Sequence, residues 1–393
     1  MKKLFWFGWI GLLLFEIANV YFIMPMPGSQ RMDSIDLAYF LYRWRWVIRG
    51  LFALMLIIGL PGAKWHRKWK WALVFPLLVL GMVIYMANFN MAADAMFRQP
   101  EQFVLAGAAE NKVDSNRLVI GVTINGEAKA YPIRFLGYHH HVQDIVGGKA
   151  IMVTYCTVCR TGRVFEPIIN GKKETFRLVG MDHFNAMLED ATTKSWWQQA
   201  TGKAVAGKLK GQQLPEVLST QTSLSHWLVL HPESRIMQAD STFIASYDTT
   251  LKYESGKSKN KLTGTDSLSW KDKSWVIGVK CGDERKAYDW NQLKQERIIH
   301  DKLGNTPLAV VLASDDRSFF AFELPATGVE LSMTNDTLLL INKHFRIDGR
   351  GIDTAYSLKQ LQAYQEFWHS WKSFHPNTTQ YKRLDQEVKD LMK

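Results

Sequence analysis

The sequence predicts an α+β protein in which N-terminal transmembrane helices precede two tandem, pseudo-repeated and strand-rich lobes. Three observations lead to this prediction. Long apolar segments are confined to the first quarter of the chain, a segment of fifty residues recurs later without a gap, and short apolar runs alternate around Asn-Gly turns. We therefore expect a membrane anchor of about three transmembrane helices over residues 1–97, a first lobe over 98–240 and a second, degenerate lobe over 241–393.

The anchor contains three apolar segments, over residues 4–24, 46–63 and 71–89. Crossing a bilayer takes about 20 apolar residues, so each segment is near the required length, although the second is short and carries Arg49. The first segment lacks a clear small-x-small cleavage site and two further spans follow it. We therefore expect a retained span rather than a cleaved signal peptide.

The basic residues of the anchor predict its orientation, because cytoplasmic loops are enriched in Lys and Arg. Two lysines precede the first span, and four basic residues lie between the second and third: Lys2, Lys3, Lys64, Arg67, Lys68 and Lys70. The opposite loop weakens the pattern with Arg31, Arg43 and Arg45, among which lie Asp33 and Asp36. An interfacial belt is indicated by Trp65, Trp69 and Trp71. We expect a multi-pass protein of the inner (cytoplasmic) membrane with its C-terminal domain in the periplasm or outside the cell.

The formal charge of +11 agrees better with this topology than with nucleic-acid binding. Residues 1–97 hold ten Lys and Arg against four Asp and Glu, a surplus of six. The remaining surplus of five is spread over the rest of the chain without a basic run. We expect the lipid bilayer as a partner, allow for an envelope protein partner, and expect no nucleic acid.

Glu16 lies near the middle of the first span, where a carboxylate is costly and is a functional candidate by default. Arg49 is its nearest plausible partner in the bundle. We favour a structural role for Glu16, either as a helix-pairing contact or as a protonated carboxyl that faces a neighbouring helix.

The remainder of the chain contains one pattern twice. Residues 117–166 align with residues 274–323 at an offset of 157. The two copies share a Val-Ile-Gly-Val, an Ala-Tyr, an Asp, a Gly and a Phe-Glu, which begin at 119 and 276, 130 and 287, 144 and 301, 147 and 304, and 165 and 322. Each copy closes on a Trp-x-x-x-His-Pro, whose His231 and His375 we expect to serve the fold. Two copies are too few for a solenoid and predict a pseudo-symmetric pair of lobes.

The elements of the first copy follow in order. Two strands flank Asn125-Gly126, a strong hairpin signal. Residues 134–146 have mixed helical spacing and stop at Gly147-Gly148, which predicts a helix. Residues 150–155 form a short apolar run and predict a buried strand, and a second hairpin is expected around Asn170-Gly171.

A Cys-x-x-Cys, Cys156 and Cys159, falls where that buried strand ends and a loop begins, a frequent position for sites. The second copy has Ala313 and Asp316 at these positions and Glu296 in place of His139. If the cysteines only stabilised the fold, the second copy would need them too. Their absence from the second copy therefore favours a functional pair. We expect His140 and His141 on the surface and Cys281 as a small buried hydrophobic residue.

The segments VIGVTINGEAKAYP, VTYCTVC and SWWQQATGKAVAG resemble the prokaryotic, bacterial family of domain of unknown function 3179. The resemblance covers about residues 100–240 well and the rest as a degenerate copy. It places the motif residues of the family on His139, Cys156, Cys159, Asn185, Asp190, Trp197, Gln199 and Gly202. The chain departs from the pattern at Arg160, where the family usually has Gly and where a bulky cation narrows the approach to the thiols. The family carries no established activity, so the resemblance implies no reaction.

Three chemistries remain open for the cysteine pair. Cys156, Cys159 and His139 would form a soft ligand set for zinc or copper, with His183, His140, Asp190 or water as the fourth ligand. A redox dithiol would use one thiolate for attack and the second to resolve, with Arg160 lowering a thiol pKa. A small-loop disulfide would be purely structural.

We therefore expect a membrane-anchored extracytoplasmic protein of unknown activity that binds a metal ion or acts as a dithiol through Cys156, Cys159 and His139. The alternative is a non-catalytic envelope interaction module in which the cysteines form a structural disulfide. Whether the protein is an enzyme stays open, with a catalytic pocket of Cys156, Cys159, His139, Asn185 and Gln199 as the candidate. A Ser-His-Asp triad, a phosphate loop and a haem-attachment motif are missing from the sequence, so the substrate class stays open.

Overall fold

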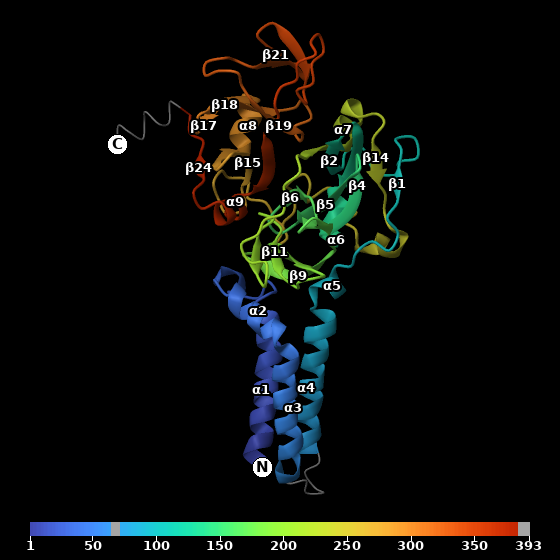
Figure 1. The fold of residues 1–393 in the computed structure, drawn as a ribbon, viewed down its shortest axis with the longest axis vertical. Helices are drawn as coiled ribbons and strands as arrows, with labels where there is room; N and C mark the ends of the chain where they lie inside the picture. Colours follow the sequence, from blue (N-terminus) through green and yellow to red (C-terminus); the bar gives the residue numbers. More distant parts are fainter. Residues whose placement is uncertain (64–70, 384–393) are drawn as a thin grey trace, which may run out of the picture. The chain divides into compact units, whose positions relative to one another are not determined.

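The computed structural model describes residues 1–63 and 71–383 (Figure 1). The chain divides into two compact units. Unit 1 comprises residues 1–99, 174–198 and 203–213, and unit 2 comprises the remaining described residues. This division differs from the expected lobe boundaries, because most of residues 174–213 belongs with the N-terminal helices.

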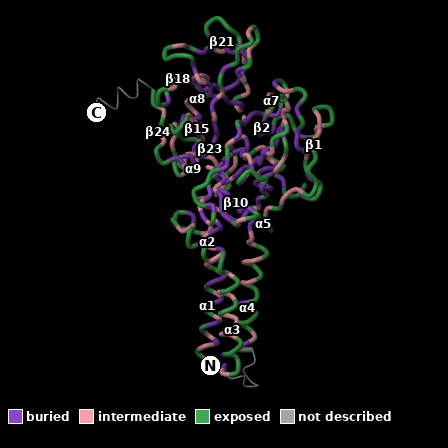
Figure 2. The backbone as a smooth tube through the Cα atoms, viewed as in Figure 1, coloured by how far each residue is buried: buried purple, intermediate pink, exposed green. Residues whose placement is uncertain are grey.

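Unit 1 begins with the three expected apolar helices, α1 (Lys2–Tyr21), α3 (Arg45–Gly59) and α4 (Trp71–Tyr85). Within the described residues, three helical segments are long and apolar enough to cross a membrane, namely Lys2–Tyr21, Arg45–Ala63 and Leu73–Asn90. Figure 2 shows exposed residues along α3 and α4, and these include large apolar side chains. The short helices between and after the spans are α2 (Ile35–Arg43) and α5 (Ala93–Met96).

Small residues let α1 and α3 approach closely. A Cβ at Gly11 would overlap the ring of Phe52, and one at Gly8 would lie 2.9 Å from the Phe52 carbonyl oxygen. Small residues at such contacts are characteristic of helix pairs in membranes. The basic residues Lys64, Arg67, Lys68 and Lys70, together with Trp65 and Trp69, lie outside the described residues. The orientation of the anchor therefore stays a prediction.

Unit 1 also contains a four-stranded antiparallel sheet in the order β12-β11-β10-β9. Its strands are β9 (Phe176–Asp182), β10 (Asn185–Asp190), β11 (Trp196–Gln198) and β12 (Ala204–Ala206). Met187 and Trp196 of this sheet share an apolar cluster with Val20 and Ile23. Gly180 leaves room for the backbone of Ile23, whose carbonyl accepts a 2.7 Å hydrogen bond from the Met181 amide. Residues 174–198 and 203–213 group with the anchor because of these contacts.

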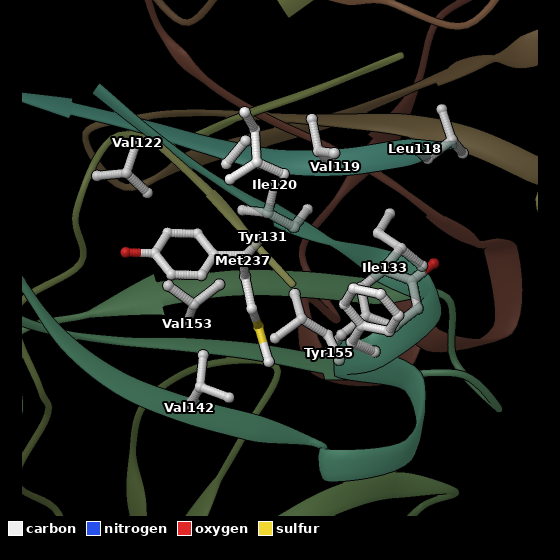
Figure 3. Packing of buried hydrophobic residues seen from close by; sticks show 14 of the residues in the cluster. Leu118, Val119, Ile120, Val122, Tyr131, Ile133, Val142, Val153, Tyr155 and Met237 are labelled. Atoms are coloured by element: carbon white, nitrogen blue, oxygen red, sulfur yellow. The ribbon is translucent and has the colours of Figure 1, made fainter. Parts of the chain in front are cut away.

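The first half of unit 2 contains a five-stranded sheet in the order β1-β14-β3-β2-β13 and a three-stranded sheet in the order β4-β5-β6. The first sheet is built from β1 (Leu105–Ala106), β2 (Leu118–Ile124), β3 (Glu127–Pro132), β13 (Thr220–Ser223) and β14 (Arg235–Met237). The second contains β4 (His141–Val146), β5 (Lys149–Cys156) and β6 (Thr161–Phe165). The accompanying elements are α6 (Ile133–His139), α7 (Leu224–Leu230) and the small hairpin β7 (Ile168–Ile169) and β8 (Lys172–Lys173). Ile120 and Val122 of β2 face Val142 and Val153 of β4 and β5 in the core between the sheets (Figure 3).

The second half of unit 2 has a sheet in the order β23-β15-β16-β24 and a sheet in the order β17-β18-β19. The strands are β15 (Trp275–Cys281), β16 (Glu284–Asp289), β17 (Ile298–Leu303), β18 (Thr306–Leu312), β19 (Phe319–Glu323), β23 (Gln362–Phe367) and β24 (Thr379–Gln380). The helices are α8 (Trp290–Glu296) and α9 (Trp368–Phe374). A further three-stranded sheet consists of β20 (Ser332–Thr334), β21 (Thr337–Leu340) and β22 (Lys343–Arg346).

The strand pairings of the two halves have the same registers. Val119 pairs with Pro132 on β2 and β3, and Val276 pairs with Asp289 on β15 and β16, so each partner is shifted by 157. The hairpins β5–β6 and β18–β19 obey the same offset, because Tyr155 pairs with Gly162 and Leu312 with Phe319. The parallel pairs β14–β3 and β24–β16 also correspond.

Several residues that recur in the two copies have matching structural roles. A Cβ at Gly121 would overlap the indole of Trp227, and one at Gly278 would overlap that of Trp371. Each indole nitrogen donates a 2.7 Å hydrogen bond, to Ser234 Oγ and Thr378 Oγ1 respectively. The recurring tyrosines donate to the recurring aspartates, at 2.8 Å for Tyr131 to Asp144 and 2.9 Å for Tyr288 to Asp301.

The histidines of the closing motifs stack on the same tryptophans. The ring centroids lie 4.1 Å apart for Trp227 and His231, and also for Trp371 and His375. Burial lowers the pKa of His231 to about 4 and that of His375 to about 2, so both rings are neutral at pH 7. These contacts agree with the expected role of both histidines in the fold.

The single helix expected over residues 134–146 is wrong in its second half. α6 ends at His139, His140 has a left-handed backbone with φ 61°, and β4 begins at His141. The reason is long-range: β4 forms an antiparallel ladder with β5, and this pairing overrides a weak helical pattern. The hairpin around Asn125-Gly126 and the buried strand at 150–155 are confirmed.

Candidate functional site

The Cys-x-x-Cys occupies the turn of the β5–β6 hairpin. Cys156 is the last residue of β5 and pairs with Thr161, the first residue of β6. Arg160 has a left-handed backbone with φ 58°. Glycine adopts this conformation without steric cost, whereas Arg160 adopts it with a large side chain.

Both thiols of this turn are fully buried and lie close together. All three cysteines are among the described residues, and no disulfide joins any two of them. Burial raises the pKa of the Cys159 thiol well above its ordinary value, and a hydrogen bond with the Cys156 thiol raises it further. Ser370 opposes this shift through a hydrogen bond to Cys159. Cys159 is therefore a neutral thiol at pH 7 and a poor nucleophile while the turn is closed.

Arg160 does not activate Cys159 as expected. Its buried guanidinium donates to Gln365 Oε1 at 2.9 Å and to the carbonyl oxygens of Tyr253 and Glu254 at 3.0 and 3.1 Å. It also lies over the ring of Trp275, 3.8 Å from the centroid. The pKa of Cys159 is raised, chiefly by burial, so the nearby Arg160 does not leave this thiol with a lowered pKa. The arginine holds the turn in place instead.

The thiol turn contacts β23 and α9 of the second half of unit 2. The amide of Phe367 donates to the carbonyl oxygen of Cys159 at 3.1 Å, and the hydroxyls of Thr161 and Ser370 are 3.2 Å apart. Next to them, Arg163 and Glu366 form a buried ion pair. The sequence pattern contains no signal for Ser370 or Glu366, because both reach the turn from more than 200 residues away and only the tertiary fold brings them there.

The corresponding turn of the second half makes a reciprocal contact. Asp315, between β18 and β19, accepts a 2.7 Å hydrogen bond from Ser223 Oγ at the end of β13. Ser318 Oγ accepts a 3.2 Å hydrogen bond from the Ser223 amide. The turn of each half therefore contacts the strand before the closing helix of the other half.

The three histidines before the turn are all buried. His139 Nε2 lies 2.8 Å from the Tyr247 hydroxyl, and its ring packs edge-on against Phe243. His140 Nδ1 lies 3.1 Å from the carbonyl oxygen of Tyr155, and burial lowers the pKa of His140 to about 4. The expectation that His140 and His141 are surface residues is wrong, because the left-handed turn at His140 leads the chain into the β4 ladder.

A metal centre is not assembled in the described part of the chain. No group of three or more His, Cys, Asp or Glu side chains there is arranged to hold a metal ion. The contact of His139 with Tyr247 occupies one of its ring nitrogens. The zinc or copper site on Cys156, Cys159 and His139 stays a prediction.

Of the other motif residues, Gln199 reaches the thiol hairpin. Its side-chain nitrogen donates to Thr154 Oγ1 at 2.8 Å and to the Thr161 carbonyl at 2.9 Å, so it ties β5 to β6. The remaining candidates Asn185, Asp190, Trp197 and His183 belong to unit 1. There, Trp197 Nε1 donates a 3.0 Å hydrogen bond to Asp190 Oδ2, which also accepts from the Ser195 amide. Asp190 thereby closes the β10–β11 turn.

The comparisons with known proteins give one result. Residues 98–378 match the family described as "Protein of unknown function (DUF3179)". No curated protein and no solved structure matches the chain significantly. The match spans well over half of the 393 residues and includes both halves of unit 2. On this evidence, the chain belongs to the DUF3179 family.

Proposed function

We propose that the protein is a membrane-anchored, extracytoplasmic dithiol protein in which Cys156 and Cys159 interconvert between two thiols and a disulfide. The observation that carries the proposal is the hydrogen bond between the two buried thiols within one hairpin turn. Two sulfurs held in contact by a short turn form a bond with little movement of the chain. The corresponding turn of the second half has Ala313 and Asp316 in place of Cys156 and Cys159. This difference supports a function that only the first half performs.

The reaction is a two-electron exchange. One thiol loses its proton and attacks a sulfur of a partner disulfide, and one partner thiol leaves. The second cysteine then attacks the mixed disulfide, so that an S–S bond forms between Cys156 and Cys159 and the second partner thiol is released. Two electrons and two protons pass from the pair to the partner disulfide, which becomes a dithiol.

Because the turn is buried, the thiol–disulfide exchange requires the turn to open first. Since the raised pKa of Cys159 keeps its thiol neutral, attack requires an opening that admits water. The same opening breaks the hydrogen bond from the Phe367 amide to Cys159. The redox state of the pair would thereby be coupled to the contact between the two halves of unit 2.

The extracytoplasmic placement rests on the anchor. Three helices of sufficient length and apolarity support a multi-pass protein of the inner membrane. The basic residues before α1 and between α3 and α4 support a cytoplasmic N-terminus, with unit 2 in the periplasm or outside the cell as the consequence. Alkaline phosphatase fused after residue 98 is expected to be active. An inactive fusion together with an active cytoplasmic reporter would overturn the orientation.

The dithiol itself is tested on the full-length protein in detergent. In dithiol/disulfide buffers of graded potential, we expect Cys156 and Cys159 to oxidise together in one two-electron step while the protein stays folded. Cys156→Ser and Cys159→Ser remove the step, and Cys281→Ser, the matched control on β15, retains it.

Two other results would reject the dithiol. A disulfide that resists native reduction, together with Ser variants that unfold readily, would show a structural clip in a non-catalytic interaction module. Stoichiometric zinc or copper that is lost in the Cys156→Ser variant would show a metal site. Elemental analysis of the same samples separates these two results.

A further inference from the structure

Unit 1 contains a cavity of about 410 Å³ at one end of the helix bundle. Its walls come from the C-terminal end of α1, the N-terminal part of α3, the segment after α4, and β9. These helix ends are where the three candidate spans would leave the hydrocarbon core, on the side opposite the N-terminus. The cavity therefore lies at the depth of lipid headgroups if the helices cross a membrane.

Three arginines line this cavity, and they differ in whether they form an ion pair with a carboxylate. Arg49 donates to both oxygens of Glu16, at 2.6 and 2.8 Å, and to Asn88. Arg177 pairs with Asp94 and Glu189 at 2.7 Å each. The guanidinium charges of these two arginines are compensated by carboxylates.

Arg45 is the third arginine and forms no ion pair with a carboxylate in the part of the chain that the structure describes. It donates to the Tyr42 carbonyl at 2.6 Å and lies over the Tyr42 ring at 3.9 Å. A half-buried guanidinium fixed in this way retains its charge and several donors for an anion. Phosphate is the anion that arginine binds well through paired hydrogen bonds.

Asn19 gives a second, independent indication of what the cavity binds. It lines the cavity, is 8% exposed, and its Oδ1 accepts no hydrogen bond from any described residue. A buried amide oxygen without a donor is destabilising. A hydroxyl or an ammonium group on the occupant of the cavity would supply that donor.

The rest of the cavity wall is apolar. Val20, Ile23 and Ile84 line it, and Trp46 and Phe89 add large side chains that are 70% and 63% exposed. Exposed aromatic side chains at the ends of membrane spans are typical of the lipid interface. A polar end with an apolar opening fits an amphipathic molecule better than a soluble ion.

We propose that this cavity binds one phospholipid whose headgroup carries a hydrogen-bond donor, such as phosphatidylethanolamine or phosphatidylglycerol. The phosphodiester lies against Arg45, the headgroup ammonium or hydroxyl donates to Asn19 Oδ1, and the acyl chains leave past Trp46 and Phe89. This inference rests on the proposed membrane anchoring and is independent of the cysteines. Phosphatidylcholine has the same phosphate but no donor, so the site discriminates against it.

The test uses the full-length protein, delipidated in mild detergent and then offered equal amounts of phosphatidylethanolamine, phosphatidylglycerol and phosphatidylcholine with identical chains. Native mass spectrometry reads the lipid that stays bound. We expect one lipid per chain and a preference of about tenfold for the two donor-bearing lipids over phosphatidylcholine. Equal retention of all three lipids would overturn the proposal.

Two variants and a control locate the site. Asn19→Leu should abolish the discrimination against phosphatidylcholine, and Arg45→Gln should weaken retention of all three lipids about tenfold. Arg43→Gln makes the same charge change two residues away, outside this cavity, and should bind as the wild type does. Wild-type lipid retention in both Asn19→Leu and Arg45→Gln, with unchanged melting temperatures, would place the lipid elsewhere.

Two further arms separate the alternative explanations. Displacement of the bound lipid by inorganic phosphate or glycerophosphoethanolamine at millimolar concentration would identify a site for soluble phosphates and reject a lipid site. A chain that alkaline carbonate extracts from membranes would refute the anchoring itself. A chain that stays in the membrane without lipid preference would refute only this site.

Discussion

The indole of Trp227 occupies the space that a side chain at position 121 would take, and Trp371 does the same at position 278. In each copy, therefore, the glycine of Val-Ile-Gly-Val contacts the tryptophan of Trp-x-x-x-His-Pro. The motif residues that recur most clearly in the sequence are packing residues. Cys156 and Cys159 do not recur in the second copy, so the packing that the two copies share does not account for their presence.

This contact predicts the effect of a single methyl group. Gly121→Ala and Gly278→Ala should each lower the free energy of unfolding by about 1–3 kcal/mol, because an added Cβ overlaps a buried ring in a well-packed core. Denaturant or thermal unfolding of the full-length protein measures the change. Gly107→Ala is the control, since its added Cβ meets only the flexible end of Glu110, at 3.0 Å. Unchanged stability in both variants would contradict this account of the motif.

The Cys159 thiol predicts a dependence of stability on pH. Its pKa in the folded protein is raised above that in the unfolded chain, which is about 8.5. The stabilisation is therefore complete below that pH and is lost as the pH rises toward the folded pKa, because only the unfolded chain releases the proton. The loss approaches about 1.4 kcal/mol per pH unit.

This dependence is measured as the difference in stability between pH 7.5 and 9.5 in the reduced protein. Cys159→Ser should show a smaller loss than the wild type, and Cys281→Ser should behave as the wild type does. An equal loss in Cys159→Ser would mean that other groups cause the whole dependence.

At the scale of elements, the β5–β6 turn combines an unfavourable backbone conformation at Arg160 with favourable contacts of the Arg160 side chain. Arg160 accepts a left-handed conformation, which costs a non-glycine residue about 1 kcal/mol. Its guanidinium, however, donates to three acceptors of the second half and the connecting segment, two of them buried. Arg160 thus holds the turn closed over the thiols.

Two substitutions separate these opposing effects. Arg160→Ala and Arg160→Gly both remove the hydrogen bonds, but only glycine relieves the backbone. We expect both variants to be less stable than the wild type, and Arg160→Ala to be less stable than Arg160→Gly by about 1 kcal/mol. Denaturant unfolding decides the order. Equal stability of the two variants would show that the turn adopts another conformation.

The elements that local sequence determines were predictable, and those that distant contacts determine were not. Asn125-Gly126 forms its hairpin because both residues tolerate the positive φ that such a turn requires. His141–Val146 forms a strand because β5 offers a ladder, which no local pattern reveals. Residues 174–198 and 203–213 group with the anchor, which they contact through the backbone of Ile23, and Ser370 reaches Cys159 from the other half. The pair of cysteines was thus visible in the sequence, but its surroundings were not.

At the scale of the whole chain, the contact between the halves of unit 2 depends on a buried charge pair. Arg163 and Glu366 are at most 1% exposed and come from β6 and β23. Arg163 also lies 3.5 Å from the centroid of the Tyr364 ring. Breaking one partner of a buried pair leaves a charge without compensation, whereas replacing both partners by apolar residues is often tolerated.

Arg163→Met should therefore cost about 3–5 kcal/mol of unfolding free energy, and Arg163→Met with Glu366→Met should recover most of that loss. Thermal unfolding of the single and double variants measures the recovery. Lys149→Met is the control, because the Lys149–Glu166 pair is 3.6 Å apart and largely exposed, and its loss should stay within about 0.5 kcal/mol. A double variant no more stable than Arg163→Met would contradict this account of the pair.

The reciprocal contacts between the halves also bear on how such a chain could have arisen. The turn of each half meets the strand end of the other, which is the arrangement of an isologous interface about a two-fold axis. An ancestor with one half would have carried both surfaces and could have formed a homodimer with two identical turns. In that dimer, any change to one turn would have appeared in both. Joining the two halves in one chain removes this constraint, so that one turn can keep a pair of thiols while the other becomes a plain structural support.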